Sequence, residues 1–169
     1  MKCAVVKTSR SIFFGCSFMN IVVICHNIRS RENVGAIFRT SDAFGVGKIY
    51  LTGYTPTPPH EKISKTALGA ENWIPWEKVS SPVRLIKKLK KEGITVIALE
   101  KNKKSRDINT FSFKTPQKPI ALILGNEVSG VPKKICDIDD YILHIPMRGK
   151  KESLNVAVAL GIALYYFTK

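Results

Sequence analysis

Short apolar runs alternate with longer amphipathic stretches along this chain. Residues 20–25 are uncharged, and residues 21–24 within them are all β-branched and apolar, which is typical of a strand buried on both faces of a sheet. Between such runs, apolar residues recur every three or four positions, the period of a helix with one buried face. The pattern predicts strands at residues 20–25, 48–52, 94–99, 119–124 and 141–145, and helices at residues 33–44, 63–68, 83–92, 132–136 and 156–167.

Strands that alternate with helices indicate an α/β fold with a mostly parallel sheet and flanking helices. The 169 residues fit one domain, and the chain contains no internal repeat or low-complexity tail. Residues 53–82 are rich in proline and predict an irregular connection. Residues 101–118 form a basic loop between two strands.

The N-terminus contains basic residues before an apolar run at residues 11–18, which faintly imitates a signal peptide but has no small-x-small cleavage site. We expect a single domain at residues 19–169, preceded by an extension, residues 1–18, that either is dispensable for folding or reflects an early start codon. Expression from Met19 tests this expectation, and loss of folding would contradict it.

The formal net charge of +14 favours a polyanionic partner such as RNA or DNA. The most apolar stretch, residues 156–167, is shorter than the roughly 20 residues of a membrane-spanning helix, so we expect a buried or subunit-facing helix and no membrane insertion. The four cysteines show no CxxC pairing and no histidine at metal-ligand spacing. We therefore expect no metal site, and reduced thiols in a cytoplasmic protein. These cysteines are Cys3, Cys16, Cys25 and Cys136.

Polar loops follow three of the predicted strands, at the edge where parallel α/β sheets bind ligands. The first leads into a helix that contains Asn33 and Arg39. The second, Gly-Asn-Glu-Val-Ser-Gly, contains Glu127 between two glycines that let the backbone approach a ligand closely. The third contains three basic residues before Ser153 and Asn155, which can cap the next helix at a position that favours anions.

Each loop alone also fits an ordinary structural role. Arg39 could be a surface arginine or an ion-pair partner of Asp42, a Gly-Asn-Glu segment is common in turns, and a basic loop is usually solvated. The three histidines have no partners of a catalytic kind in the sequence, so we expect solvated or hydrogen-bonded structural roles for His26, His60 and His144.

Together the three loops resemble the SpoU (TrmH-like) branch of the SPOUT RNA methyltransferases. Residues 33–39, Asn-Val-Gly-Ala-Ile-Phe-Arg, are similar to the first family motif, residues 122–130 to the second, and residues 145–147 with 153–157 to the third. Their order and spacing agree with the family, and the resemblance extends from residue 20 to the C-terminus. The first motif is more similar to the guanosine-18 tRNA and rRNA members than to the small wobble-position tRNA enzymes.

The resemblance implies transfer of a methyl group from S-adenosylmethionine to a ribose 2′-hydroxyl of tRNA or rRNA, by a homodimer. It also implies a deep C-terminal trefoil knot, an exception to the rule that chains do not thread loops. The expected walls of the cofactor pocket are Leu99, Gly125, Ile145, Met147 and Leu154. The expected catalytic group is Arg39, Asn33, Glu127, Ser153 and Asn155.

The family assigns the arginine that matches Arg39 to the hydroxyl, as a base or activator. A charged guanidinium has no acceptor, so we expect Arg39 chiefly to bind the adjacent phosphate and orient the ribose. Asn33 would hold the nucleotide or Arg39, and Glu127 would orient Arg39 or its loop. Ser153 and Asn155 would fix the third loop.

Basic residues are expected to bind the RNA backbone without reading much sequence. They are Arg84, Lys87, Lys88, Lys91, Lys101, Lys103, Lys104 and Arg148. The last apolar helix is expected to pack the knot and the dimer interface, so that Ala159→Arg would reduce dimerisation and activity together. A catalytically silent RNA-binding module and a base-directed methyltransferase on the same fold remain alternatives.

Overall fold

The computed structural model describes residues 19–112 and 119–169, and in this part of the chain it forms one parallel sheet flanked by helices. The strands are β1 (Met19–His26), β2 (Val46–Thr52), β3 (Trp76–Val79), β4 (Thr95–Leu99), β5 (Arg106–Asp107), β6 (Ile120–Leu124) and β7 (Tyr141–His144). Their order across the sheet is β3-β2-β1-β6-β4-β7-β5, and every pair is parallel. The α/β class with a mostly parallel sheet is confirmed.

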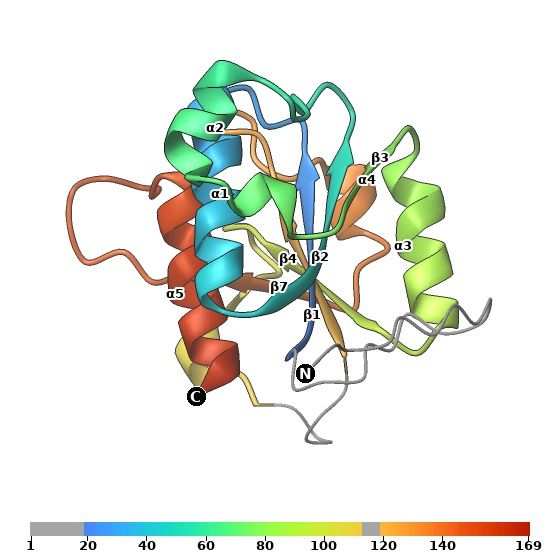
Figure 1. Cartoon of the computed structure of the whole chain (residues 1–169). Helices are drawn as coiled ribbons and strands as arrows, with labels where there is room; N and C mark the ends of the chain where they lie inside the picture. Colours follow the sequence, from blue (N-terminus) through green and yellow to red (C-terminus); the bar gives the residue numbers. More distant parts are fainter. Residues whose placement is uncertain (1–18, 113–118) are drawn as a thin grey trace.

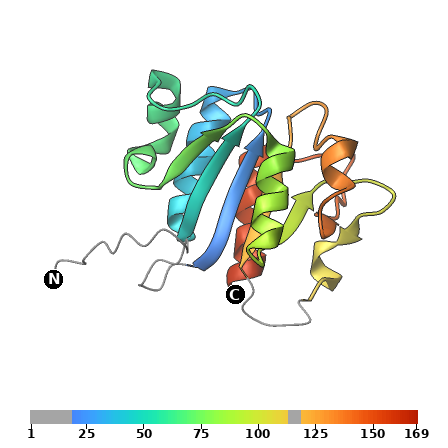
Figure 2. The ribbon, with the colours of Figure 1, turned by 90° about the vertical axis from the view of Figure 1, so that its right-hand side faces the viewer.

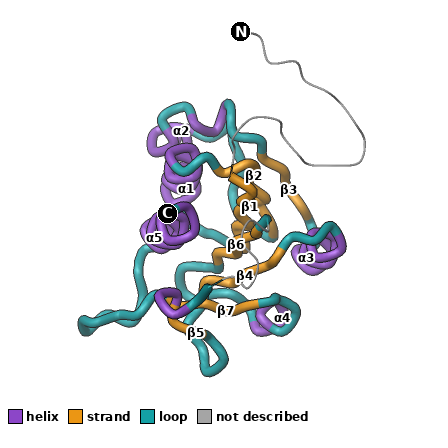
Figure 3. The backbone as a smooth tube through the Cα atoms, turned by 90° about the horizontal axis from the view of Figure 1, so that it is seen from below, coloured by secondary structure: helices purple, strands orange, loops and turns teal. Residues whose placement is uncertain are grey.

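Helices cover both faces of this sheet (Figure 1). They are α1 (Arg31–Ala43), α2 (Glu61–Ala67), α3 (Pro82–Lys91), α4 (Lys133–Cys136) and α5 (Val156–Thr168), with short 3₁₀ turns η1 (Ala70–Asn72) and η2 (Ile108–Thr110). Figure 3 shows α1, α2 and α5 on one side of the row of strands, and α3 and α4 on the other. Figure 2 views the sheet from the side of α3, with α1 and α5 behind the strands.

Two strands were missed by the pattern of apolar residues. β3 contains the exposed Glu77 and Lys78, and β5 is only two residues long. Both lie at the edges of the sheet, where a strand is less buried and its sequence is less apolar. The other five strands lie at the predicted places, with ends shifted by one or two residues.

Side chains of the central strands alternate between two hydrophobic clusters, one on each face of the sheet. On β1, Val23 packs with Phe38 of α1 and Leu160 of α5, whereas Ile24 packs with Leu89 of α3. All of these residues are fully buried. Burial on both faces explains why the central strands are uninterrupted apolar runs.

The two described cysteines are buried free thiols. Burial raises the pKa of Cys25 to about 12 and that of Cys136 to about 11, so both thiols stay protonated and unreactive at neutral pH. The expected extension, residues 1–18, lies outside the described residues together with Cys3 and Cys16. Among the described helices, none has the length and apolar character needed to cross a membrane.

Candidate functional site

Asn33, Glu127 and Asn155 meet in one hydrogen-bonded network, although they come from three separate segments: the first turn of α1, the loop after β6 and the start of α5. The Asn33 Nδ2 atom donates to Glu127 Oε1 at 2.9 Å. The Asn155 Nδ2 atom donates to Asn33 Oδ1, also at 2.9 Å. The structure thus brings three of the five expected catalytic residues together at the carboxyl edge of the sheet.

The Glu127 carboxylate also holds the segment that leads into α1. It accepts hydrogen bonds from the backbone N–H groups of Arg29 (2.9 Å) and Ser30 (3.1 Å). Burial alone would raise the pKa of Glu127, but these backbone bonds and the bond from Asn33 outweigh it and lower the pKa. Of the two expected roles of Glu127, the contacts favour orientation of the loop rather than of Arg39.

The lowered pKa of Glu127 gives a prediction for the pH dependence of this loop. A carboxyl group whose pKa is lower in the folded state than in the unfolded state stabilises the fold at any pH above its unfolded-state pKa. That stabilisation is lost as the pH falls through the folded-state pKa. We expect hydrogen exchange at the Arg29 and Ser30 amides, corrected for intrinsic rates, to accelerate as the pH falls below the ordinary glutamate pKa of about 4.3. Glu127→Gln should accelerate it already at neutral pH, whereas Glu61→Gln, at the exposed start of α2, should not. Unchanged protection in Glu127→Gln would contradict the assigned role.

Two helices begin beside this network. Ser30 caps α1, because its Oγ atom accepts a hydrogen bond from the Asn33 N–H at 3.0 Å. Asn155 caps α5, because its Oδ1 atom accepts from the Ala157 N–H at 2.9 Å. Ser153 was expected at the same helix start, but it lies on the loop before it and lines a pocket instead.

That pocket has a volume of about 290 Å³ and lies between the loops that follow β4, β6 and β7. All five residues expected to form the cofactor pocket line it. The other lining residues are Glu100, Lys101, Leu124, Asn126, Glu127, Val128, Ser129, Gly130, Leu143, His144, Glu152, Ser153, Val156 and Ala159. The pocket therefore combines apolar walls with a few polar groups, as small-molecule sites do.

Gly125 leaves the loop after β6 no room for a side chain. A Cβ atom at this position would lie 2.2 Å from the carbonyl carbon of Gly130. Asn126 and Gly130 exchange two backbone hydrogen bonds, of 3.1 and 2.9 Å, which close the loop. The glycine therefore sets the shape of this pocket wall.

Sequence reasoning missed several polar residues of the pocket, and two of them, Glu100 and Asn126, hold its walls in place. Glu100 accepts a hydrogen bond from the Val131 N–H at 2.6 Å and so ties β4 to the end of the loop after β6. Asn126 is only 7% exposed and accepts hydrogen bonds from Val128 N and Ser129 N at 2.8 and 2.9 Å. The available signal was an acid directly after a buried strand, and an amide beside Gly125.

Arg39 lies six residues after Asn33, about 9 Å further along α1. Its side chain is exposed, and within residues 19–112 and 119–169 it has no hydrogen bond or ion pair. Asp42 is not its partner, because Asp42 accepts a hydrogen bond from Trp73 Nε1 at 2.8 Å. The guanidinium is therefore available to a ligand rather than engaged within the protein.

Comparison with known proteins confirms the family resemblance of the three motifs. The model of the SpoU rRNA Methylase family matches residues 20–165, which include all of them. The chain belongs to this family. A tRNA (guanosine(18)-2′-O)-methyltransferase of Aquifex aeolicus is 36% identical over 147 residues, which cover 86% of this chain and 67% of that protein. A 23S rRNA (guanosine-2′-O-)-methyltransferase of Coxiella burnetii is 32% identical over 86% of this chain and 56% of its own length.

Solved SpoU structures share the fold. The AdoMet-bound rRNA methyltransferase from Sinorhizobium meliloti superposes with a TM-score of 0.80 at 31% identity, over 87% of this chain and 55% of that one. The A. aeolicus TrmH/SpoU tRNA modifying enzyme gives a TM-score of 0.79 at 33% identity, over 88% of this chain and 74% of that one. This SpoU chain thus spans about half to three quarters of the length of these relatives.

The histidines of this SpoU chain have structural partners. His26 Nδ1 is 2.9 Å from Thr52 Oγ1, and burial lowers the pKa of His26, which favours the neutral ring. His60 caps α2, and His144 Nδ1 is 3.0 Å from Ser105 Oγ. The expected hydrogen-bonded structural roles are in keeping with these contacts. In the described ranges, no three His, Cys, Asp or Glu side chains gather in a way that could hold a metal ion.

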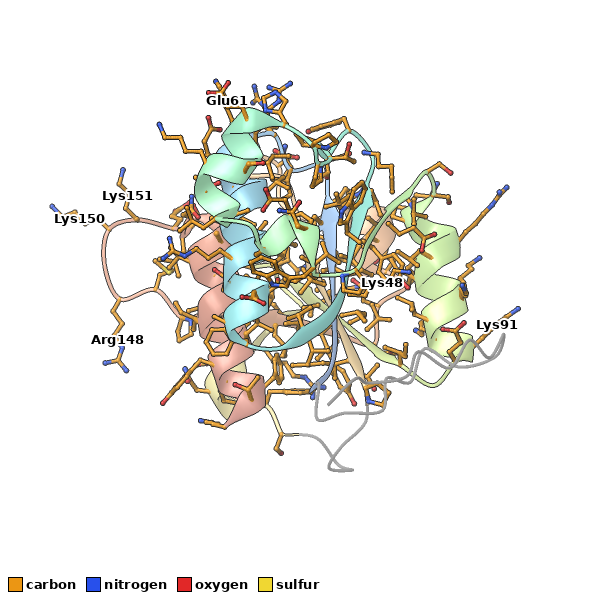
Figure 4. The ribbon with its side chains drawn as sticks, viewed as in Figure 1. Lys48, Glu61, Lys91, Arg148, Lys150 and Lys151 are labelled. Atoms are coloured by element: carbon orange, nitrogen blue, oxygen red, sulfur yellow. The ribbon has the colours of Figure 1, made fainter. Side chains whose placement is uncertain are left out.

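The basic residues expected to bind RNA fall into separate groups. Lys101 lines the pocket, and Arg148 projects from the loop between β7 and α5, as do Lys150 and Lys151 (Figure 4). Lys103 and Lys104 follow on the loop after β4, and Lys104 pairs with Asp137 at 3.5 Å.

The other four residues of that set are on α3, across the sheet from α1 and α5 (Figure 3). They are Arg84, Lys87, Lys88 and Lys91, and Lys88 lies 4.0 Å from Glu92. The structure therefore does not bring the α3 residues to the pocket.

Proposed function

We propose that this SpoU protein transfers a methyl group from S-adenosylmethionine to a ribose 2′-hydroxyl of tRNA or rRNA. The observation that carries the proposal is the link between the pocket and the Asn33–Glu127–Asn155 network: Glu127 belongs to both. Relatives named for tRNA and for 23S rRNA share guanosine in their names, so guanosine is the favoured target nucleoside.

The pocket residues fit S-adenosylmethionine, whose sulfonium supplies the methyl group. Leu99, Ile145, Met147 and Leu154 offer apolar surface to an adenosine, and the tight packing of Gly125 against Gly130 sets the shape of the adjoining wall. The carboxylates of Glu100 and Glu152 on the pocket wall favour a cationic ligand.

The network would position the nucleotide rather than react with it. Glu127 and Asn155 fix the Asn33 amide from both sides, so that Asn33 is held in one orientation. Arg39 would bind the phosphate beside the target ribose through its planar fork of N–H donors. The hydroxyl proton would leave late, or pass to that phosphate, because a charged guanidinium cannot accept it. Lys101 and Arg148 would bind the RNA backbone next to the pocket.

A homodimer through α5 is part of the proposal. Val158, Ile162 and Tyr165 are 51%, 40% and 66% exposed, and their spacing of four and three residues puts them on one face of the helix. An exposed apolar stripe of this kind is typical of a subunit interface. Ala159 lines the pocket, so the expected Ala159→Arg test would confound dimerisation with cofactor binding.

Ile162→Arg is therefore the better test of the dimer. It should convert the protein to a monomer, because a charge would be placed within the apolar stripe, and sedimentation velocity measures this directly. Leu68→Arg, an equally apolar exposed residue after α2, is the control and should leave the assembly unchanged. A dimer that persists in Ile162→Arg would contradict an α5 interface.

We also propose that residues 19–169 form one catalytic domain with a C-terminal knot, in the cytoplasm. A single sheet that includes strands from β1 to β7 supports one domain. Convergence of the loops after β6 and β7 on one pocket supports the knotted arrangement of the family. Buried free thiols at Cys25 and Cys136 support a reducing compartment.

Titration calorimetry with S-adenosylmethionine tests the proposed function without knowledge of the RNA. Saturable binding with one site per chain is expected, and Leu154→Asp should abolish it, since a charge would replace an apolar pocket wall. Absence of binding to the wild-type protein would favour a silent RNA-binding module.

A further inference from the structure

Tyr54 combines an exposed ring with a fixed hydroxyl. The residue follows β2, and 60% of its surface is exposed. Its hydroxyl accepts a hydrogen bond from Asn126 Nδ2 at 2.8 Å, and the same amide donates to the Asn27 carbonyl at 2.9 Å. The ring is therefore anchored at its tip, although much of its surface is open to solvent.

The backbone of Tyr54 is fixed as well. The Tyr54 N–H donates to Asn27 Oδ1 at 3.2 Å. Gly53, directly before it, has a φ of +63°, and a Cβ there would lie 1.8 Å from Asn27 Oδ1. Thr55, directly after it, is 1% exposed, and its hydroxyl donates to the Thr52 carbonyl at 2.8 Å. A ring held at both ends loses little conformational entropy when it binds a flat ligand.

The anchor of Tyr54 belongs to the candidate site. Asn126 lines the pocket, and the next residue, Glu127, holds Asn33. Asn27, which Tyr54 contacts through its backbone, lies on the loop whose Arg29 N–H donates to Glu127. The ring therefore lies at the same edge of the sheet as the network, and it contacts Asn126, a residue of the pocket wall.

We propose that the ring of Tyr54 stacks on the base of an unpaired RNA nucleotide bound at the Asn33–Glu127–Asn155 network. This inference rests on the proposed function and names its substrate class: a nucleotide in a single-stranded or looped segment. Proteins recognise such unpaired bases by stacking them on exposed aromatic rings, whereas a base inside a duplex has no free face.

Three variants test the stacking role of Tyr54. Tyr54→Ala removes the ring, whereas Tyr54→Phe keeps it and removes only the bond with Asn126. Trp73→Ala is the matched control, because Trp73 is also 60% exposed but contacts Asp42, at the opposite end of α1 from Ser30. The probe is a fluorescein-labelled single-stranded RNA of mixed sequence, with its duplex for comparison, measured by fluorescence polarisation.

Tyr54→Ala should weaken single-strand binding about tenfold, a typical loss for one stacked base. Tyr54→Phe and Trp73→Ala should stay within about twofold of the wild-type protein. Duplex binding should change little in all three variants, because it depends on phosphate contacts. Calorimetry should give an unchanged affinity for S-adenosylmethionine in Tyr54→Ala.

Three results would overturn the stacking role. The first is a Tyr54→Ala variant that binds single strands as tightly as the wild-type protein. The second is a Tyr54→Phe variant that loses as much affinity for single-stranded RNA as Tyr54→Ala and also loses affinity for S-adenosylmethionine. This result would mean that Tyr54 only supports Asn126. The third is a changed oligomeric state of Tyr54→Ala, which would mean that a second copy covers the ring. None of these three results depends on methyl transfer. A failure of the stacking role can therefore be distinguished from a failure of the proposed function.

Discussion

Arg39→Ala should slow single-turnover methyl transfer about 100-fold or more at saturating RNA, while the affinity for S-adenosylmethionine stays unchanged. The exposed guanidinium of Arg39 has no hydrogen bond or ion pair within the described ranges, so its removal disturbs no internal contact. What is lost is a bidentate donor that would fix the phosphate and the ribose beside it.

Two further variants separate orientation from proton transfer. Arg39→Lys should recover only part of the rate, because an ammonium cannot bind phosphate with a planar fork. Arg84→Ala, an exposed arginine on α3 across the sheet, is the control and should leave the single-turnover rate within about twofold of the wild-type rate. Strong rescue of Arg39→Ala by guanidines, with a dependence on the guanidine pKa, would contradict the orienting role and identify a base.

Gly125→Val should reduce S-adenosylmethionine affinity by about 100-fold or more, since its side chain cannot be accommodated without displacing the pocket wall. Even the Cβ atom of the new side chain would lie 2.2 Å from the backbone of Gly130, and the backbone cannot rotate away as a side chain can. Calorimetry measures the loss, and circular dichroism with a thermal melt confirms that the variant is folded.

Gly149→Ala is the matched control for the glycine test. Gly149 is on the loop between β7 and α5, and in the described part of the chain only its own atoms and those of its two sequence neighbours lie within 4 Å of the position that a Cβ would take. Its cofactor affinity should equal that of the wild-type protein. A folded Gly125→Val variant that binds S-adenosylmethionine normally would show that this pocket is not the cofactor site.

The central part of the fold could be predicted from the sequence because its strands are buried on both faces. After their first residues, Asn20 and Pro119, the runs at residues 20–25 and 119–124 have no polar position that could be mistaken for a loop. The edge strand β3 was not predicted because Glu77 and Lys78 face solvent. Its sequence therefore lacks the apolar pattern that indicates a strand. The order of the strands depends on long-range packing, which no local pattern contains.

The site was only partly accessible from the sequence. The contact between Asn33 and Asn155 joins residues 122 positions apart, and it exists because α1 packs against α5. Tyr54 gave no signal, since a tyrosine after a strand is common, and the position of Asn126 beside Gly125 was only a weak one, since an asparagine in a turn is also common. The motifs identified the loops, whereas the hydrogen bonds between those loops had to come from the structure.

The central claim is methyl transfer to a ribose 2′-hydroxyl. The most direct measurement incubates the purified protein with isotopically labelled S-adenosylmethionine and unmodified tRNA and rRNA transcripts, followed by nuclease digestion and mass spectrometry of the nucleosides. The account predicts label in a 2′-O-methylated nucleoside, at a phosphodiester bond that has become resistant to alkaline cleavage. Label on a base, or no label in any RNA despite S-adenosylmethionine binding, would contradict it.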